Sequence, residues 1–466
     1  MTIPVVLIHG YSDVPQSFYR WEEALSELGH KRSDVHICGY RSLTNEVTIK
    51  DIAEGFDRAL RVRAGLQEEE PFDAIVHSTG MLVIRAWLTT YAKQEKRKRR
   101  LKRLIALAPA SFGSPLAHKG RSWLGAIFKG NRALGPDFMD AGDLVLDSLE
   151  LASRYTWDLA HRDLLSDEVF YGADEDTPYV FTFCGAGNYR GLQGLVTNPE
   201  GTDGTVRWAG CSLNTRKITL NLTTDEADTT INRLDFGKWH KDRRSNLQIP
   251  FVPIAGLNHG SIIEEPSQEL IDLVSSALEV SNQDDYQKWN ELAIQKTAQT
   301  LSGMTPWQQF IVRAVDERKD PITDYYVRLH AGYQEDPANL KLIDINVHAY
   351  SSDKSLRSFH FNLNELGLDK LIRLRIEVIA SSGTDLVKYR GHLPSPEREE
   401  DKNEKQGASS EWTAVFDMDQ LITNAEVKLF TPFTTTLIEL QLNREPESRS
   451  PHGTKVTWFI DREEPA

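Results

Sequence analysis

Residues 73–87 read DAIVHSTGMLVIRAW, and this stretch decides the fold. Residues 73–76 have the composition of a buried strand, and an apolar helical pattern begins soon afterwards, at Leu82. Ser78 therefore lies in a very short turn between a buried strand and a buried helix. A serine in such a turn either caps the helix or is the most reactive group in the chain.

Size and charge narrow the class of protein. The chain has 466 residues, which is too long for one ordinary domain, so we expect two. Hydrophobic residues make up 40% and charged residues 26%, as in soluble globular proteins. A formal net charge of −14 argues against nucleic acid as the main partner. The three cysteines, Cys38, Cys184 and Cys211, are too few and too scattered for a disulfide framework or a metal site, which favours a reducing compartment or a surface poor in cysteine.

Neither a membrane span nor an export signal is expected. No apolar run reaches the roughly 20 residues that a membrane-spanning helix needs. The first residues, MTIPVVLIHGYSD, lack a basic segment and a small-residue cleavage site, and their short β-branched core predicts a first strand instead. We therefore expect a protein that is cytoplasmic or peripherally associated with a membrane.

Strands alternate with helices in the first part of the chain. The predicted strands are near-continuous apolar runs, at 3–9, 34–38, 73–76, 101–109, 179–185 and 249–255. Such runs are typical of a parallel sheet that helices cover on both faces. Amphipathic spacing predicts the helices, at 17–28, 49–64 and about 266–280, besides the one after Ser78. We assign residues 1–283 to this α/β domain.

A long insertion, 113–178, separates two of these strands. It contains the apolar stretch RSWLGAIFKG, so Trp123 and Phe128, together with Met81 after the serine, are candidates to line a substrate pocket. Long insertions in compact domains are more often functional than idle, and we expect a cap over the pocket. Simple packing of the insertion on the edge of the sheet is the alternative.

The pattern changes after residue 283. A helix is expected at 286–301, and short alternating strands recur from residue 308 onward. Alternation at this spacing predicts an antiparallel β-sandwich within residues 284–466. Residues 394–410, PSPEREEDKNEKQGASS, are charged and poor in apolar side chains, which predicts a mobile loop between two strands. This half shows no cluster of catalytic residue types.

The turn at Ser78 resembles a nucleophile elbow. The elbow pattern is G-x-S-x-G, and residues 76–80 read VHSTG. Gly80 supplies the second glycine, whereas Val76 replaces the first, so a branched side chain must fit where the strand meets a crossing element. An elbow lifts the serine hydroxyl above the sheet and aims helix N–H groups at it. Ser78 is therefore the candidate nucleophile.

A serine hydroxyl needs a base before it becomes a good nucleophile. The sequence IPFVPIAGLNHGSII places His259 in the loop after the last predicted strand, just before the final helix of the domain. Only His259 among the 13 histidines has both this order and this setting, and His240 is the second candidate. We predict that His259 is the base.

A carboxylate must hold the imidazole in the right tautomer and stabilise its cation. Asp203 lies in a Gly-Thr-Asp-Gly turn after the fifth predicted strand, and the order Ser78, Asp203, His259 is the one that this architecture uses. Asp-Gly is otherwise a common turn signal. Asp174 and Asp176 are the alternative acids, but they precede that strand and so lie at its wrong end.

Two backbone amides are expected to form an oxyanion hole. The first strand ends in His9-Gly10, and the loop that follows supplies one amide in this architecture, that of Tyr11. Thr79, directly after the serine, supplies the other. Each such donor contributes about 3 kcal/mol to stabilisation of the transition state.

These residues together resemble the α/β-hydrolase superfamily, and within it the bacterial lipases and the PlaB-like phospholipase A/lysophospholipases. The similar segments are VHSTG (76–80), IALAPASFGSPLA (105–117), LDSLELASRYTWDL (146–159), GTDGTVR (201–207) and GLNHG (256–260). A hydrolase domain followed by a strand-rich domain is also similar to that phospholipase group. The resemblance is weak over the C-terminal half, and Met81 stands where many relatives have a second glycine.

The resemblance implies a bacterial serine hydrolase that cleaves carboxylic esters of lipids through an acyl-enzyme on Ser78, with no cofactor and no metal. It also implies membrane association and a homo-oligomer. Two alternatives stay open: a carboxylesterase for short soluble esters, and a catalytically inactive hydrolase-fold protein that binds a membrane or a partner. The basic run KQEKRKRRLKR (93–103) either attracts anionic lipid headgroups or is a solvated helix end.

Overall fold

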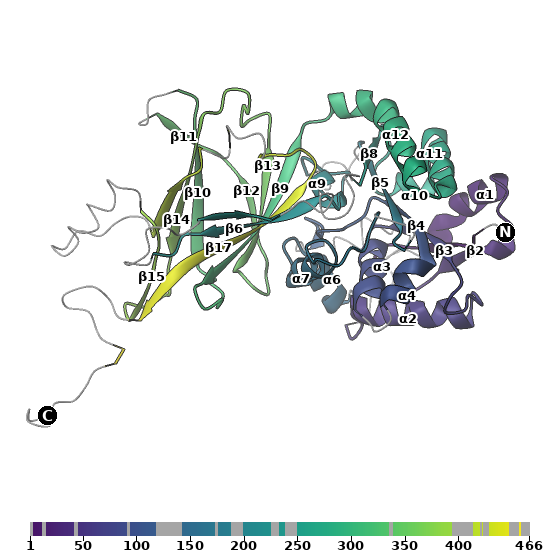
Figure 1. The fold of residues 1–466 in the computed structure, drawn as a ribbon, viewed down its shortest axis with the longest axis horizontal. Helices are drawn as coiled ribbons and strands as arrows, with labels where there is room; N and C mark the ends of the chain where they lie inside the picture. The colour runs from purple at the N-terminus through teal and green to yellow at the C-terminus, as the bar shows by residue number, and fades with distance from the viewer. Residues whose placement is uncertain are drawn as a thin grey trace, which may run out of the picture.

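The protein consists of two packed bodies, one built from a sheet and helices and the other mainly from strands (Figure 1). The structure is a computed structural model. It describes residues 3–11, 15–41, 45–90, 94–117, 142–172, 176–187, 199–224, 233–237, 249–334, 339–393, 413–419, 422, 428–446 and 456–457. Five features named above lie outside these ranges: Trp123, Phe128, His240, Asp174 and the loop 394–410.

The first body contains a six-stranded sheet in which every pairing is parallel. Its strand order is β2 (Val35–Cys38), β1 (Val5–Ile8), β3 (Phe72–His77), β4 (Leu101–Leu107), β5 (Tyr179–Gly185) and β8 (Phe251–Ile254). Successive side chains of a strand point to opposite faces. Val5 and Leu7 accordingly belong to one core cluster and Val6 and Ile8 to another, so both faces are buried. The predicted α/β fold is confirmed.

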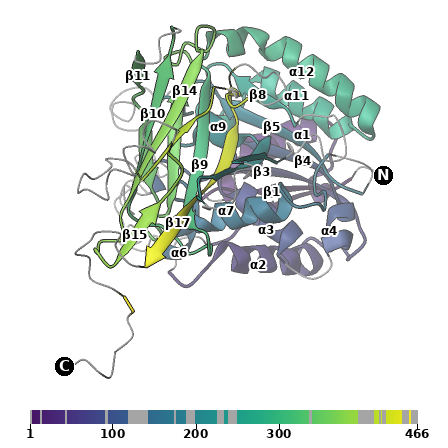
Figure 2. The same ribbon diagram turned by 60° about the vertical axis from the view of Figure 1, so that its left-hand side comes forward.

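Helices cover the two faces of this sheet (Figure 2). One core cluster gathers side chains of α2 (Ile49–Val62), α3 (Gly80–Thr89) and α7 (Arg154–Asp163). The other gathers side chains of α1 (Tyr19–Glu27), α10 (Ser261–Glu264), α11 (Gln268–Glu279) and α12 (Gln283–Gly303). Thr48 caps α2 with a reciprocal pair of hydrogen bonds to Asp51, which satisfies backbone N–H groups at the start of the helix.

Helix α12 packs on the first body, although it follows the predicted domain boundary at residue 283. Its residues Tyr286, Trp289 and Ala293 join the core cluster of the parallel sheet. The hydroxyl of Tyr286 donates to the carbonyl of Val180 in β5 at 2.6 Å. The sequence predicts a helix at 286–301, but it does not say which body this helix covers.

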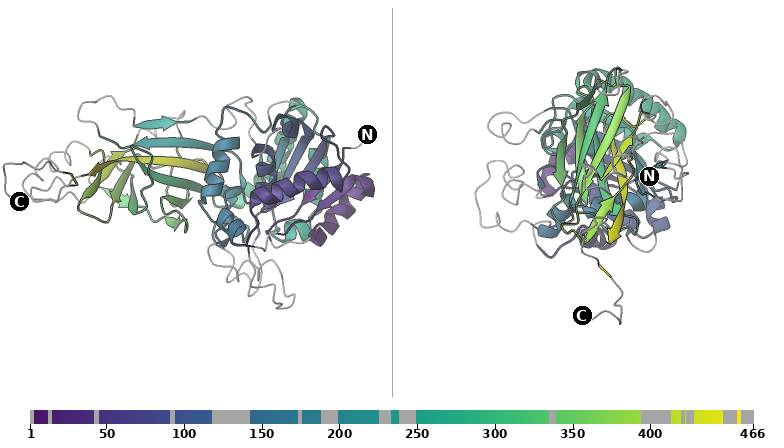
Figure 3. Two further views of the ribbon diagram at one scale, coloured as in Figure 1. Left: turned by 90° about the horizontal axis from the view of Figure 1, so that it is seen from below. Right: turned by 90° about the vertical axis from the view of Figure 1, so that its left-hand side faces the viewer.

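The second body is built from two sheets (Figure 3). One has the order β11 (Leu340–Leu342), β10 (Tyr325–Gly332), β14 (Arg373–Ala380), β16 (Ala414–Asp417). The other has the order β12 (Asn346–Ala349), β13 (Leu356–Asn362), β9 (Trp307–Asp316), β17 (Thr435–Pro446), β6 (Thr215–Asn221), β7 (Leu234–Phe236), with β15 (Val387–Arg390) beside β17. Most pairings are antiparallel, as the sandwich pattern predicted, but β17 runs parallel to both β9 and β6.

Strand β6 belongs to the second body although it precedes the last strand of the first. The chain therefore enters the β body, returns to complete the parallel sheet at β8, and enters the β body again at β9. The predicted boundary after residue 283 omits this exchange. The segment TRKITLN alternates as a strand should, but alternation alone does not identify the partner strand.

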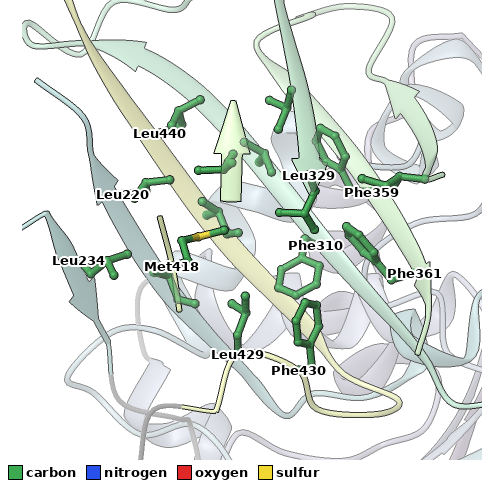
Figure 4. A pocket seen from close by; sticks show the side chains of 16 residues that line it. Leu220, Leu234, Phe310, Leu329, Phe359, Phe361, Met418, Leu429, Phe430 and Leu440 are labelled. Atoms are coloured by element: carbon green, nitrogen blue, oxygen red, sulfur yellow. The ribbon is translucent and has the colours of Figure 1, made fainter. Parts of the chain in front are cut away.

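A cavity between the two β sheets is lined by apolar side chains (Figure 4). Side chains from both sheets point into a cavity that they line: Ile218, Leu220, Leu234, Phe310, Val312, Val327, Leu329, Ile345, Phe359, Phe361, Ile376, Met418, Leu429, Phe430, Ile438 and Leu440. Phe310 packs edge-on against Phe361 and Phe430, with ring centroids 5.3 and 6.1 Å apart. This cluster holds the two sheets together.

The described part of the insertion packs between the two bodies. Asp163 at the end of α7 forms a fully buried ion pair with Arg85 of α3, with Nε and Oδ2 2.7 Å apart. On the other side, Glu150 after α6 (Asp143–Leu149) accepts a hydrogen bond from His348 of the β body at 2.9 Å. These contacts match simple packing, and the cap over a pocket remains a prediction.

The basic run forms its own helix, α4 (Gln94–Arg100), and the start of β4. Most of its cations have partners within the chain: Arg97 pairs with Asp57 at 3.2 Å, and the buried Lys98 pairs with Glu168 at 2.7 Å. These cations are therefore engaged in holding α4 in place. Among the described residues, no helix is both long and apolar enough to cross a bilayer.

Candidate active site

Ser78 sits in the turn between β3 and α3, as predicted. Its φ is +51°, a conformation that costs energy for any residue with a side chain. The surrounding backbone holds it there, because the Ser78 amide donates to the Leu107 carbonyl and the Ala110 amide donates to the Ser78 carbonyl, both at 3.1 Å. A serine in such a strained turn after a buried strand is the geometry of a nucleophile elbow.

The two flanking positions show why the motif tolerates one departure. At Gly80, a Cβ would lie 2.7 Å from the carbonyl oxygen of Ile8, so this position needs glycine. Val76 is fully buried within β3, between Ile8 of β1 and Ala106 of β4. The sheet therefore accommodates the branched side chain where the pattern has a glycine.

The structure brings Ser78, His259 and Asp203 together. The Nε2 atom of His259 lies 3.1 Å from the Ser78 hydroxyl oxygen, and its Nδ1 atom lies 2.8 Å from Oδ2 of Asp203. Asp203 and His259 are fully buried, and Ser78 is 3% exposed. With the proton on Nδ1, the imidazole donates to the carboxylate and accepts from the hydroxyl, which is the arrangement of a base-activated nucleophile.

Asp203 is fixed by its own turn. Its second carboxylate oxygen accepts hydrogen bonds from the amides of Thr205 and Val206, at 3.0 and 2.8 Å. Its backbone carbonyl accepts from the amide of His259 at 3.0 Å, so the acid and the base are also joined through the main chain. Asp176, one of the alternative acids, instead pairs with Arg99 at 3.1 Å.

His77, directly before the serine, also contacts the base, which the sequence did not suggest. Its Nε2–H donates to the backbone carbonyl of His259 at 3.0 Å, and the two ring centroids are 4.7 Å apart. The x position of G-x-S-x-G carries no residue-type signal of its own. Its contact depends on how β3 and the loop after β8 meet, and only the tertiary structure shows this.

The two predicted oxyanion donors lie beside each other. The amide of Tyr11 donates to the side-chain oxygen of Thr79 at 3.2 Å, so the loop after β1 does reach the residue after the serine. His9 holds this loop in place, since its carbonyl accepts from the Tyr40 hydroxyl at 2.7 Å and its ring stacks on Tyr40. A substrate oxygen would have to take the place of the threonine hydroxyl at the Tyr11 amide.

Of the three pocket candidates, only Met81 lies within the described residues. Met81 is fully buried in the core cluster beneath α3 and lines neither described cavity. A helix that packs on the sheet at this point leaves its first turn inside the core, and the pocket role of Met81 remains a prediction.

The other reactive groups to consider among the described residues are two buried cysteines and possible metal ligands. Burial raises the pKa of the thiols of Cys184 and Cys211 well above the ordinary value, and both cysteines are free. A protonated thiol is a weak nucleophile. Within the described residues, no group of three or more His, Cys, Asp or Glu side chains is arranged to hold a metal ion.

The turn that carries Asp203 is packed against the β body. Gly201 in this turn has a φ of +70° and faces the stacked rings of Trp307 and His360, whose centroids are 4.3 Å apart. A Cβ on Gly201 would lie 2.7 Å from atoms of both rings. Glycine is therefore required here both by the backbone and by the neighbouring domain.

Arg207 ties the end of the same turn to three strands of the β body. Its Nη1 atom donates to Gln309 Oε1 at 3.0 Å and to Ser358 Oγ at 2.7 Å, and its Nη2 atom donates to Asn346 Oδ1 at 3.3 Å. The β body thus helps to position the turn that carries Asp203, the predicted acid.

Comparison with known proteins finds similar solved structures, but no protein-family model and no curated protein matches the sequence. Among solved structures, phospholipase PlaB from Legionella pneumophila is similar, with a TM-score of 0.76 and 23% identity over 98% of each chain. That phospholipase in complex with thio-NAD aligns equally, with a TM-score of 0.76 and 23% identity over 100% of this chain and 97% of the other. The mature lipase BlEst2 from Bacillus licheniformis aligns with a TM-score of 0.37 and 14% identity over 59% and 92%.

The chain therefore has an α/β-hydrolase fold followed by a β-sandwich-like domain. Its architecture over nearly the whole length is that of phospholipase PlaB. The expected resemblance to the PlaB-like proteins is confirmed for the fold. It also extends into the C-terminal half, where the sequence resemblance is weak.

Proposed function

We propose that this protein is a serine hydrolase that cleaves carboxylic esters of lipids. The observation that carries the proposal is the hydrogen-bonded chain from Ser78 through His259 to Asp203, with the serine in a strained turn at the carboxyl end of a parallel sheet. A strained serine costs stability, and surrounding structure retains such strain mainly at functional sites.

The proposed reaction is acyl transfer through Ser78. His259 takes the hydroxyl proton while the Ser78 oxygen attacks the ester carbonyl, and Asp203 stabilises the resulting imidazolium. The carbonyl oxygen gains negative charge as the bond forms, and the amides of Tyr11 and Thr79 donate to it. His259 then protonates the leaving alcohol. In the second half, His259 activates a water that releases the fatty acid from the acyl-enzyme.

Lipid esters are the proposed substrates because the similarity to a phospholipase spans both bodies. By that likeness we propose phospholipase A and lysophospholipase activity, with membrane association and oligomers. A carboxylesterase for short soluble esters would use the same triad. A catalytically inactive protein is disfavoured, because it would have no use for a strained serine within hydrogen-bond distance of a base.

Fatty-acid release tests this proposal. Native protein should release fatty acid from phospholipid vesicles and from a lysophospholipid, and Ser78→Ala should lower kcat by about 10⁶-fold without unfolding the protein. Asp203→Asn should lower it by about 10⁴-fold, because the wrong tautomer is favoured. Each assay is run with and without NAD, since the similar phospholipase was solved with thio-NAD.

The outcomes separate the alternatives. Cleavage of only a short soluble ester would support the triad but indicate that the protein is a carboxylesterase for soluble esters. Fluorophosphonate labelling that persists in Ser78→Ala would show that Ser78 is not the nucleophile. A folded native protein without any esterase activity would favour the inactive binding protein.

A further inference from the structure

A second pocket lies where the two bodies meet, apart from the triad. It has a volume of about 700 Å³ and is lined by residues of the acid-bearing turn, the insertion and the β body, among them Leu151, Glu200, Arg207, Trp307 and His360. None of the three triad residues lines it. The proposed hydrolysis therefore does not account for this pocket.

The inner end of the pocket holds the cation of Arg207, which is 4% exposed. Its hydrogen bonds to described residues go to the neutral oxygens of Gln309, Ser358 and Asn346. Arg85 and Arg103, which are also buried, each pair with a carboxylate at 2.7 Å. Within the described part of the chain, Arg207 has no carboxylate partner. A buried charge without a partner is costly.

Two further observations support an anion at this end. His360 is 4% exposed and lines the same pocket, and its Nε2 atom has no hydrogen-bond partner among the described residues. Burial lowers the pKa of Arg207 to about 9, because no charge among the described residues offsets the desolvation of the guanidinium. An arginine fork presents donors that match phosphate oxygens, so a phosphate would offset this cost.

The mouth of the pocket has the opposite charge. Glu200, Asp344 and Glu365 line it and are exposed. A simple anion would meet these carboxylates before it reached Arg207. A ligand that carries an ammonium group beside its phosphate avoids this repulsion, because the ammonium group faces the carboxylates while the phosphate lies inward.

We propose that this pocket binds a zwitterionic phosphate ester, with the phosphate at Arg207 and the ammonium group at the acidic mouth. Such a group comes either from the headgroup of a lipid or from a free soluble phosphodiester. Ser78 does not line this pocket, so the binding proposal can be tested separately from the proposed hydrolase activity.

Calorimetric titration of the full-length Ser78→Ala protein tests the site without turnover. Glycerophosphocholine represents the free phosphodiester, and phosphatidylcholine vesicles represent the lipid source. Saturable binding of either supports the site and identifies the source. Glycerol phosphate, which lacks the ammonium group, should bind at least about tenfold more weakly. Absence of binding by both zwitterionic probes overturns the proposal.

Asn346→Asp is the decisive variant. It places a carboxylate where the amide oxygen lies 3.3 Å from Nη2 of Arg207, so the guanidinium gains an internal counter-ion. Glycerophosphocholine should then bind at least about tenfold more weakly, while the melting temperature stays the same or rises. Asn282→Asp is the matched control, because it adds the same charge at a helix N-cap that does not line the pocket. Equal affinity in Asn346→Asp and the control would overturn the assignment of Arg207.

Discussion

The nucleophile and the acid of the triad are held in different ways. Ser78 is fixed by neighbours within the parallel sheet, through backbone bonds to Leu107 and Ala110 and through the tight approach of Gly80 to Ile8. Asp203 lies in a turn whose outer side packs against the β body. The nucleophile therefore depends on one body, and the acid depends on the contact between two.

In the proposed reaction, the C-terminal half would support catalysis by positioning Asp203, without a catalytic residue of its own. If the β body is loosened or displaced, the strained serine should remain while the acid loses its support. Changes at the interface should therefore lower activity through Asp203, whereas they should leave the elbow intact. The following predictions test this contrast, from the largest expected effect on stability to the smallest.

The largest effect is expected from the interior of the β body. Phe310→Ala removes a ring that packs against Phe361 and Phe430, and should lower the free energy of unfolding by about 3–5 kcal/mol. Denaturant titration should show esterase activity disappearing together with the β body. Tyr326→Ala, which removes an exposed ring of the same body, is the control and should change stability little. Activity that persists after the β body has unfolded would contradict the dependence of Asp203 on this body.

Gly201→Ala should act directly on the acid-bearing turn. The added Cβ meets Trp307 and His360 at 2.7 Å and forces alanine into a positive φ, for a combined cost of about 2–4 kcal/mol. Displacement of the turn should also lower kcat. Gly65 is the control, because its φ is a similar +69° but an added Cβ would have no atom within 4 Å. Gly65→Ala therefore measures the cost of the positive φ alone. Equal losses of kcat in the two variants would show that contact with the β body does not position the acid.

His360 should make the interface sensitive to acid. Burial, with a smaller contribution from Arg207, lowers the pKa of His360 well below 6.5, so the folded protein keeps it neutral. The unfolded chain takes up a proton below about pH 6.5, and stability should fall there by up to about 1.4 kcal/mol per pH unit. Unfolding measured on both sides of pH 6.5 should show a flatter pH dependence for His360→Gln. An unchanged slope in the variant would mean that other groups cause the acid sensitivity.

The smallest effect is expected at the exposed end of α4, which carries none of the contacts described for Ser78 or Asp203. Arg99 is 62% exposed and pairs with a similarly exposed Asp176. Arg99→Gln should change the free energy of unfolding by no more than about 1 kcal/mol. Binding to anionic vesicles should also stay the same, because most cations of this helix are engaged within the chain. Weaker vesicle binding by this variant would instead indicate that the basic run 93–103 contacts anionic lipid.

Local features of the sequence predicted a large part of the site. The strand, the serine and the helix of residues 73–87 are contiguous, and the chain order of Ser78, Asp203 and His259 follows from where each strand ends. The structure places His259 within hydrogen-bond distance of both Ser78 and Asp203. Features that depend on separate segments were missed, such as the contact of His77 with the carbonyl of His259.

The sequence by itself determined the local elements, because hydrophobic periodicity and turn chemistry act over a few residues. It determined that a parallel sheet would present a serine, an aspartate and a histidine from its loops. Only the tertiary structure decided that β6 joins the second body, that α12 covers the first, and that Arg207 lies buried with neutral partners among the described residues. These outcomes depend on which surfaces meet across long sequence separations. Hydrophobic periodicity indicates that a face of an element is buried, but it does not indicate which other element covers that face.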